Sequence, residues 1–188
     1  SAIEQIPHSL LTLYVAAYQS HLWNRMLERW FLKQFPTKRL VELRQKSTSV
    51  IMPGNPTTEE VQCLTATEVP LPSARQKLAA DSPWQPIVQE VMSQEGIGLE
   101  AMKFKKMRDL FFSKGERVAW FVPKDFTWYF KAVESTEHHD LRLRFVLPRG
   151  CYATMLIKRI SAVAPYGATI QDGSNSMSVS GSSERSMD

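Results

Sequence analysis

The sequence of 188 residues predicts an α+β protein in which helices and short strands are mixed along the chain. Residues 141–147 place apolar side chains at a period of two, as in a strand with one apolar face. Residues 9–33 repeat apolar side chains at helical spacing, in a stripe that needs burial against a sheet or a second helix. Between residues 36 and 73, turn residues divide short apolar runs, which is typical of short strands.

The first helix should begin after Pro7, with Ser9 as its N-cap, and run to about Lys33. Phe35-Pro36 then ends it, because the residue before a proline avoids the helical conformation. The apolar stripe consists of Leu11, Val15, Tyr18, Leu22 and Met26, widened by Trp23, Leu27 and Trp30.

Short strands are expected next at residues 40–43, 50–52 and 61–64, with a turn at residues 53–56. For the third strand an alternative stays open, since residues 57–60 also fit the cap of a helical turn. A second helix should start at residues 81–82 and end at Gly96, with Ile87, Val88, Val91 and Met92 as its apolar face.

The last third of the chain predicts strands at residues 117–122 and 126–133. In the second of these, Trp128 and Phe130 share one face and Tyr129 lies on the other. Trp120, Trp128 and Tyr129 fit either stacking platforms for bases or ordinary core residues.

Residues 141–160 form a strand, a turn and a short helix, and they carry five basic side chains and no acidic one. Leu141, Leu143, Phe145 and Leu147 line one face of the strand. The turn at residues 148–150 leaves Tyr152 at its mouth, and Ala153, Leu156, Ile157 and Ile160 form the apolar side of the helix. An aromatic side chain ringed by positive charge suits a base and its phosphate, although many such tyrosines only cover the edge of a core.

Composition excludes several classes of protein. No apolar run reaches the eighteen residues of a membrane span, so no membrane partner is expected. Two cysteines are too few for a disulfide framework and indicate a reducing compartment, and the cysteines and histidines lack zinc-site spacing, so no metal is expected. Residues 161–188 hold one basic and three acidic residues, which leaves a net charge of +6 on the rest and fits a polyanion partner.

Three strings resemble the TruD family of pseudouridine synthases. Residues 144–160, RFVLPRGCYATMLIKRI, are similar to its C-terminal signature, which is close to RFxLPxGxYATxxxRE; Arg159 stands where that signature has Glu. Residues 13–27, LYVAAYQSHLWNRML, resemble its AxxSxxxN-type helix, with Gln19, Ser20 and Asn24 as polar positions. Residues 115–128, GERVAWFVPKDFTW, match its arginine, apolar strand and proline turn.

The resemblance implies an enzyme that isomerises uridine to pseudouridine in tRNA, with position 13 as the expected site, in the cytoplasm. In that family an aspartate attacks, the glycosidic bond breaks, the uracil turns and its C5 rejoins the sugar, without cofactor or metal. The catalytic aspartate of the family precedes its long helix, so it is expected upstream of Ser1 and no catalytic residue is expected in this chain. The chain should then hold most of the family's inserted domain in residues 1–133 and the last strand and helix of the catalytic domain in residues 134–164. Residues 165–188 are predicted to be a disordered tail.

The resemblance also implies the residues that bind the substrate. Tyr152 falls on the aromatic position that stacks on the target uracil. Arg149, Lys158 and the pair Arg142 and Arg144 are expected to contact phosphates or to partner a buried carboxylate. The basic run Lys103, Lys105, Lys106 and Arg108 fits RNA contact or a solvated helix face equally. Two other functions stay open, namely an RNA-binding module without chemistry and a homologue that acts as a protein scaffold.

Overall fold

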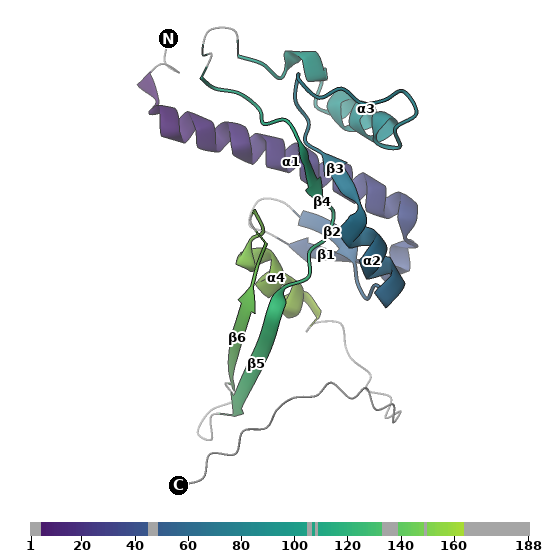
Figure 1. Ribbon diagram of the computed structural model, residues 1–188, viewed down its shortest axis with the longest axis vertical. Helices are drawn as coiled ribbons and strands as arrows, with labels where there is room; N and C mark the ends of the chain where they lie inside the picture. The colour runs from purple at the N-terminus through teal and green to yellow at the C-terminus, as the bar shows by residue number, and fades with distance from the viewer. Residues whose placement is uncertain are drawn as a thin grey trace.

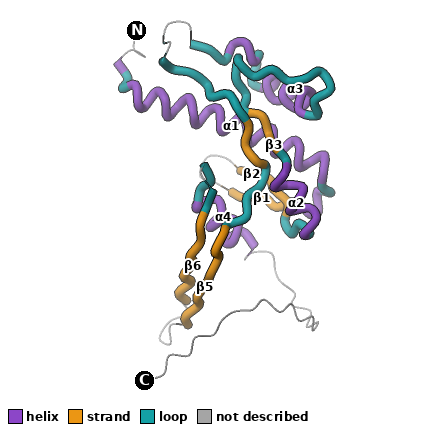
Figure 2. Tube along the Cα trace, viewed as in Figure 1, coloured by secondary structure: helices purple, strands orange, loops and turns teal. Residues whose placement is uncertain are grey.

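The computed structural model describes residues 5–44, 49–104, 107, 109–132, 139–148 and 150–163. Within these ranges the α+β prediction is confirmed, since helices alternate with two-stranded antiparallel sheets (Figures 1 and 2). The α-helices are α1 (His8–Gln34), α2 (Thr58–Ala66), α3 (Trp84–Gln94) and α4 (Ala153–Val163). The strands are β1 (Leu40–Arg44), β2 (Ser49–Pro53), β3 (Glu68–Pro70), β4 (Glu116–Val118), β5 (Lys124–Ala132) and β6 (His139–Val146), and the short 3-10 turns are η2 (Thr37–Arg39) and η3 (Leu99–Ala101).

Helix α1 spans the width of the molecule and the rest of the body is built on it (Figure 1). The prediction of Ser9 as N-cap was wrong, because Pro7 occupies that position and its carbonyl accepts from the backbone N–H groups of Leu10 and Leu11 at 2.9 and 3.1 Å. A proline needs no backbone partner there, since it has no N–H group. The predicted stop is confirmed: Phe35 is extended, with φ −123° and ψ 141°, ahead of Pro36.

The core lies where α1 packs against α3, β2 and β3. Leu22, Met26 and Phe31 of α1 are buried, and so are Ile87 and Val91 of α3. The apolar stripes predicted for the two helices are confirmed by these contacts, with the aromatic rings of Trp30 and Trp84 5.8 Å apart. Full burial of one such side chain stabilises the fold by roughly 1.5–3 kcal/mol relative to exposure.

The strand predicted at residues 61–64 was wrong, and the helical alternative is correct. Thr57 caps α2: its hydroxyl accepts from the N–H of Glu60 at 3.3 Å, while the Glu60 carboxylate accepts from the N–H of Thr57 at 2.7 Å. This reciprocal capping box satisfies two N–H groups that a helix start leaves without partners. The same carboxylate also accepts from Arg39 at 2.7 and 2.8 Å, which ties α2 to η2.

The strands at residues 40–43 and 50–52 are confirmed by the antiparallel pair β1–β2, in which Leu43 lies across from Val50. β3 pairs with β4, so the strand predicted over 117–122 is shorter and ends at Val118. Helix α3 begins two to three residues after the expected start, where the N–H of Trp84 bonds to the Ser82 hydroxyl at 3.3 Å. Its end at Gly96, with φ 68°, agrees with the sequence.

Strands β5 and β6 form a hairpin that projects away from the body (Figure 1). Trp128 pairs with Leu143 and Phe130 with Leu141, while Tyr129 pairs with Arg142 on the other face, as the sequence predicts. The first face remains exposed among the described residues, since no second layer covers it there. Trp128 and Tyr129 are therefore surface side chains, whereas Trp120 packs partly buried against the core.

Helix α4 packs on β1 through only part of its predicted apolar side. Leu156 and Ile160 are half-buried, but Ala153 and Ile157 are exposed, so β1 covers only part of the apolar stripe. Arg159 lies on the half-buried side and donates to the Pro53 carbonyl at 3.5 Å. Burial lowers the pKa of this guanidinium, and its other terminal nitrogen is buried without a hydrogen-bond partner among the described residues.

Several predictions lie outside the described residues. They concern the domain boundary between 133 and 134, the side chains Arg149, Lys105, Lys106 and Arg108, and the tail at 165–188. Lys103 is described, exposed, and lies in an irregular segment rather than in a helix. In the part of the chain with described coordinates, no helix has both the length and the apolar character needed to cross a membrane.

Candidate functional site

An open groove with a volume of about 750 Å³ runs along α1. Its other walls come from β2, from β4 and from the turn that precedes α4. Small side chains at Ala16, Ala17 and Ser20 of α1 leave room for it, and polar side chains at His21, Asn24 and Arg25 line the same wall. Residues from four separate parts of the chain thus meet in one depression.

Tyr152 belongs to this groove and not to the core, with 68% of its surface exposed. The turn before it explains the position. Gly150 adopts φ 86°, which other residues rarely adopt, and the N–H of Cys151 bonds to the Pro148 carbonyl at 3.1 Å. The carbonyl of Tyr152 then accepts from Met155 at 3.0 Å in the first turn of α4, so its backbone is held while its ring faces solvent.

The three polar positions of the α1 motif separate into two roles. Gln19 is buried; its amide donates to the carbonyls of Pro72 and Ser113 at 2.9 and 2.7 Å and accepts from the Ser113 N–H at 3.2 Å. It therefore fastens α1 to the segments around β3 and β4. Ser20 and Asn24 instead lie in the groove, four residues apart on one face of the helix.

Arg117 reaches the groove from β4 and donates to the Ser20 hydroxyl at 3.3 Å. It lies opposite Val69 in the β3–β4 pair. Cross-strand partners point to the same face of a sheet, and Val69 is fully buried toward α1. Register alone therefore directs the Arg117 side chain toward the helix.

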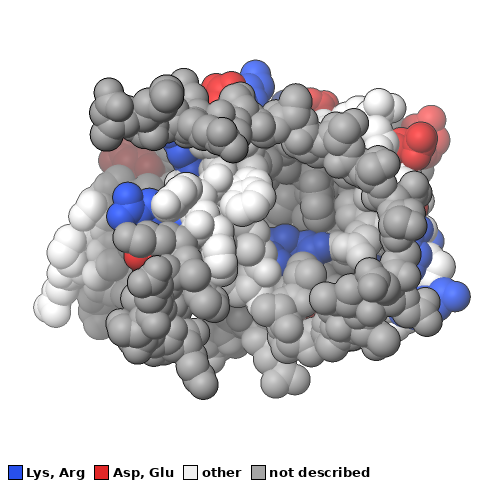
Figure 3. Space-filling view, turned by 90° about the horizontal axis from the view of Figure 1, so that it is seen from below, with Lys and Arg blue, Asp and Glu red and all other residues white. Residues whose placement is uncertain are grey.

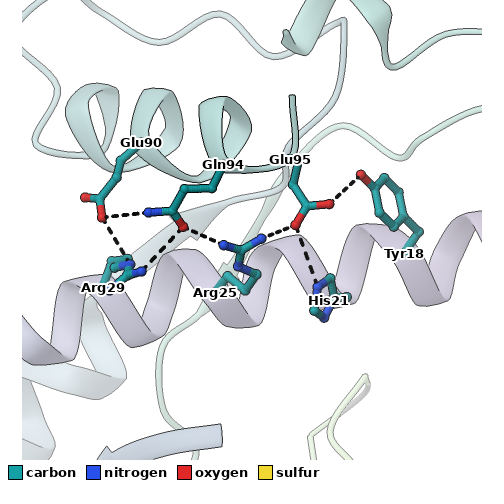
Figure 4. Close-up of polar contacts among 7 residues, drawn as sticks. All are labelled: Tyr18, His21, Arg25, Arg29, Glu90, Gln94 and Glu95. Carbon is teal, nitrogen blue, oxygen red and sulfur yellow. Dashed lines mark hydrogen bonds and ion pairs between the residues drawn. The ribbon is translucent and has the colours of Figure 1, made fainter. Parts of the chain in front are cut away.

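A polar network centred on Glu95 fixes the α1 wall of the groove to the end of α3 (Figure 4). The Glu95 carboxylate pairs with Arg25, accepts from the Tyr18 hydroxyl at 3.1 Å, and lies 4.0 Å from the imidazole of His21. Burial, together with this hydrogen bond, raises the pKa of Tyr18. Arg25 thus lines the groove while its positive charge is paired with the Glu95 carboxylate.

The second half of the network extends toward the C-terminal end of α1. Arg29 pairs with Glu90 at 3.1 Å, and the amide oxygen of Gln94 accepts from both Arg25 and Arg29. These contacts join successive turns of α1 and α3 (Figure 4). They tie several turns of α1 to the C-terminal end of α3 through shared partners.

The basic residues expected to bind phosphates lie elsewhere on the surface. Arg142 and Arg144 are exposed on the hairpin face that also carries Tyr129. Lys158 is half-buried on α4, and none of these three lines the groove with Tyr152. Figure 3 shows Lys and Arg side chains both at the rim and within a hollow of the face seen from below. The structure thus places Tyr152 in the groove and places Arg142, Arg144 and Lys158 outside its lining.

Sequence reasoning missed four ionisable groove residues, namely His21, Arg25, Glu28 and Arg117. The AxxSxxxN spacing was the available signal for the first, because His21 adjoins Ser20 on the same helix. The contact between Ser20 and Arg117 joins positions 97 residues apart, and periodicity holds no information on such a pair.

No described aspartate lines the groove, and Asp109, Asp125 and Asp140 lie on other segments. Among the residues with described positions, His, Cys, Asp and Glu side chains form no group of three or more that is placed to hold a metal ion. Cys63 and Cys151 are both unpaired. The groove lining combines the Tyr152 ring and hydrogen-bond donors with one carboxylate of the described residues, Glu28 of α1. The ring and the donors suit the binding of a base and its phosphate.

A family model described as tRNA pseudouridine synthase D (TruD) matches residues 1–160. The chain belongs to the TruD family. A protein of Methanopyrus kandleri named "Probable tRNA pseudouridine synthase D" is 32% identical over 160 residues, and the tRNA pseudouridine synthase D of Aquifex aeolicus is 27% identical over 160 residues. These matches cover 85% of this chain but only 34% and 39% of the two relatives.

The crystal structure of a TruD protein from Methanosarcina mazei has a similar fold, with a TM-score of 0.54 and 22% identity. That match covers 82% of this chain and 38% of the other. The family resemblance in the three strings is confirmed, and so is the α+β fold of a TruD-like portion. The chain spans little more than a third of the length of the relatives it matches.

Proposed function

We propose that this chain supplies the C-terminal, substrate-holding part of an enzyme that isomerises uridine to pseudouridine in tRNA. The observation that carries the proposal is the exposed ring of Tyr152 at a groove lined by hydrogen-bond donors, in a chain of the TruD family. Cytoplasmic tRNA is the substrate we expect, with position 13 as the modified site.

Tyr152 acts in this proposal as the wall on which the uracil stacks. A uridine inside a helical stack cannot be attacked at its sugar, so the nucleotide must first turn out of the stack. An exposed ring held by a fixed backbone supplies stacking at little entropic cost, worth about 1–3 kcal/mol per base. The groove has room for one nucleotide, since its volume of about 750 Å³ falls within the range of roughly 300–1,000 Å³ of small-molecule sites.

Basic side chains around the groove hold the flanking RNA. Arg142 and Arg144 are exposed on one hairpin face, and Lys158 lies on α4, the helix that begins directly after Tyr152. With Arg149 of the intervening turn, they give the C-terminal segment a positive surface that suits phosphates. Such contacts set the position of the RNA, while the pocket selects the base.

The nucleophile comes from another part of the protein in this proposal. Isomerisation moves the bond to the sugar from N1 to C5 of uracil without any net change in composition, so it calls for a carboxylate and for no cofactor. The described aspartates stand away from the groove. We place the attacking aspartate in the preceding catalytic segment, with residues 1–133 as mostly inserted domain and residues 134–164 as the last catalytic strand and helix.

Tritium release from C5-labelled uridine in tRNA tests the proposal. The protein of 188 residues should release none, and the complete gene product should release tritium at the modified uridine. Release by the shorter chain would contradict the assignment of the nucleophile. If neither protein released tritium but both bound tRNA, the result would favour the second candidate, a non-catalytic RNA-binding module. The observation that supports this candidate is that no described aspartate lines the groove.

A further inference from the structure

Arg25 and Arg117 are the two described arginines that line the groove, where Glu28 of α1 is the one described carboxylate, and Arg117 differs from Arg25 in having no charge partner among the described residues. Arg25 and His21 both face Glu95, whereas no carboxylate of the described residues lies within ion-pair distance of Arg117. Its neighbour Glu116 cannot serve, because successive strand residues point to opposite faces. Glu116 instead shares a hydrogen bond with Glu68 on the far side of the β3–β4 pair.

We propose that Arg117, together with the Ser20 hydroxyl and the Asn24 amide, binds a backbone phosphate of the RNA inside the groove, beside Tyr152. The proposal rests on the proposed function insofar as the phosphate belongs to tRNA. It assigns a role to a residue on β4, far in sequence from the basic residues of the C-terminal segment.

The contact between Arg117 and Ser20 leaves N–H groups of the guanidinium and the hydroxyl proton of Ser20 available to an anion. A guanidinium has five N–H donors in a planar fork, and one of them is used on Ser20. The others match two oxygens of a phosphate, which is the pairing that a guanidinium makes best. Ser20 accepts the bond from Arg117 through oxygen, so its own hydroxyl proton remains available to an anion. Asn24 adds an amide one helical turn further along the same wall.

A phosphate fits this set better than a carboxylate from the protein. The three groups are donors that line an open depression of about 750 Å³, large enough for a nucleotide. Tyr152 lines the same depression, and a nucleotide stacked on that ring carries a phosphate directly attached to its sugar. The ring and the guanidinium therefore match the two ends of one nucleotide.

The test measures binding of an unmodified tRNA transcript to the protein of 188 residues across a range of salt concentrations. Arg117→Ala should weaken binding and reduce the log–log salt slope by about 0.7–0.9, the value for one released counterion. Arg117→Lys should keep the slope but bind less tightly, because a lysine cannot make the two-pronged contact. Lys77→Ala removes an equal charge from an exposed residue outside the groove and should change neither quantity. Ser20→Ala should weaken binding without altering the slope.

Four results would overturn the proposal. The first is an unchanged salt slope in Arg117→Ala, and the second is an equal loss of tRNA affinity in Lys77→Ala. The third is no tRNA binding by the wild-type chain. The fourth is displacement of tRNA by inorganic phosphate beyond its effect on ionic strength, which would indicate a site for the free ion. Circular dichroism and melting of each variant check that the fold is kept. A further outcome is that Arg117→Ala leaves tRNA binding normal but abolishes tritium release when it is introduced into the complete enzyme. In that case Arg117 pairs with a protein carboxylate, so the phosphate assignment fails while the proposed function stands. A silent complete enzyme with the expected slope change would instead refute the function and leave the phosphate contact in place.

Discussion

The α1–α3 body and the β5–β6 hairpin are built from similarly apolar sequence, but they bury it to very different extents. In the body, Leu22, Met26 and Val91 are completely enclosed. In the hairpin, Trp128 is 67% exposed and Phe130 is 51% exposed. The difference follows from layering: α1 has α3 on one side and strands on the other, whereas within the described part of the chain no second layer covers the aromatic face of the hairpin.

The comparison teaches that the enclosed core and the exposed aromatic and basic side chains lie in different regions. The body contains nearly all of the buried apolar residues and the Glu95 network, so it holds the wall of the groove in place. The hairpin and the turn after it carry exposed aromatic and basic side chains, including Tyr129, Arg142 and Tyr152. Substitutions in the body should therefore mainly lower stability, whereas substitutions in the hairpin and the turn should mainly lower RNA binding or activity.

The largest effect should come from the body. Phe31→Ala removes a ring that is 1% exposed and lies 5.5 Å from the ring of Trp30 and 6.2 Å from that of Phe35. We expect it to lower the free energy of unfolding by about 3–5 kcal/mol, because the cavity cannot close fully. Trp128→Ala on the hairpin is the matched control and should cost about 0.5 kcal/mol or less. Chemical denaturation measures both, and equal losses would show that the hairpin face is covered.

The hairpin and α4 should dominate the binding of RNA. Neutralising Arg142, Arg144, Arg149 and Lys158 together should reduce the salt slope of tRNA binding by roughly three, if each contact releases 0.7–0.9 counterions. Thermal melting should change little, since Arg142 and Arg144 are exposed. A quadruple variant with the wild-type slope would remove these residues from the contact surface.

Tyr152→Ala should separate activity from stability most clearly. In the complete enzyme we expect turnover to fall about 5- to 150-fold, corresponding to a stacking contribution of about 1–3 kcal/mol. Stability should be almost unchanged, because the ring makes no core contact. Tyr152→Phe keeps the ring and should retain most of the turnover. A loss of stability as large as that of Phe31→Ala would place Tyr152 in a packing role.

The smallest effects concern two carboxyl groups of the body, the half-buried Glu60 and the exposed Glu116, whose pKa values shift in opposite directions. The hydrogen bond from Arg39 lowers the pKa of Glu60, so its contribution to stability is present at neutral pH and is lost as pH falls through that lowered value. The hydrogen bond with Glu68 raises the pKa of Glu116 above 4.5, so its contribution is present at low pH and is lost as pH rises through the raised value.

Thermal melting of the two Gln variants between pH 3 and pH 7 measures this difference. Glu60→Gln should be less stable than the wild type at pH 7, and this difference should shrink as the pH falls toward 3. Glu116→Gln should be slightly more stable than the wild type at pH 7, because it removes repulsion from Glu68. A pair of variants with the same pH profile would contradict the opposite shifts.

The sequence by itself determined the local elements of this protein and its family. The stop of α1 at Phe35-Pro36, the apolar faces of α1 and α3, and the two faces of the β5–β6 hairpin all follow from periodicity and from proline, which act over a few residues. The signature around Tyr152 identified the TruD family for the same reason, because it is one continuous string. The one clear error in element type, at residues 61–64, arose where a capping box and a short apolar run compete.

Only the tertiary structure decided what meets at the groove. Ser20 meets Arg117, and Tyr18 meets Glu95, across 97 and 77 residues of sequence. Such contacts depend on how α1, α3 and the β3–β4 pair pack together, and the sequence pattern around each residue does not name its partner. Exposure was also decided at this level, because an alternating strand is buried only where a second layer covers it, and the hairpin has none among the described residues.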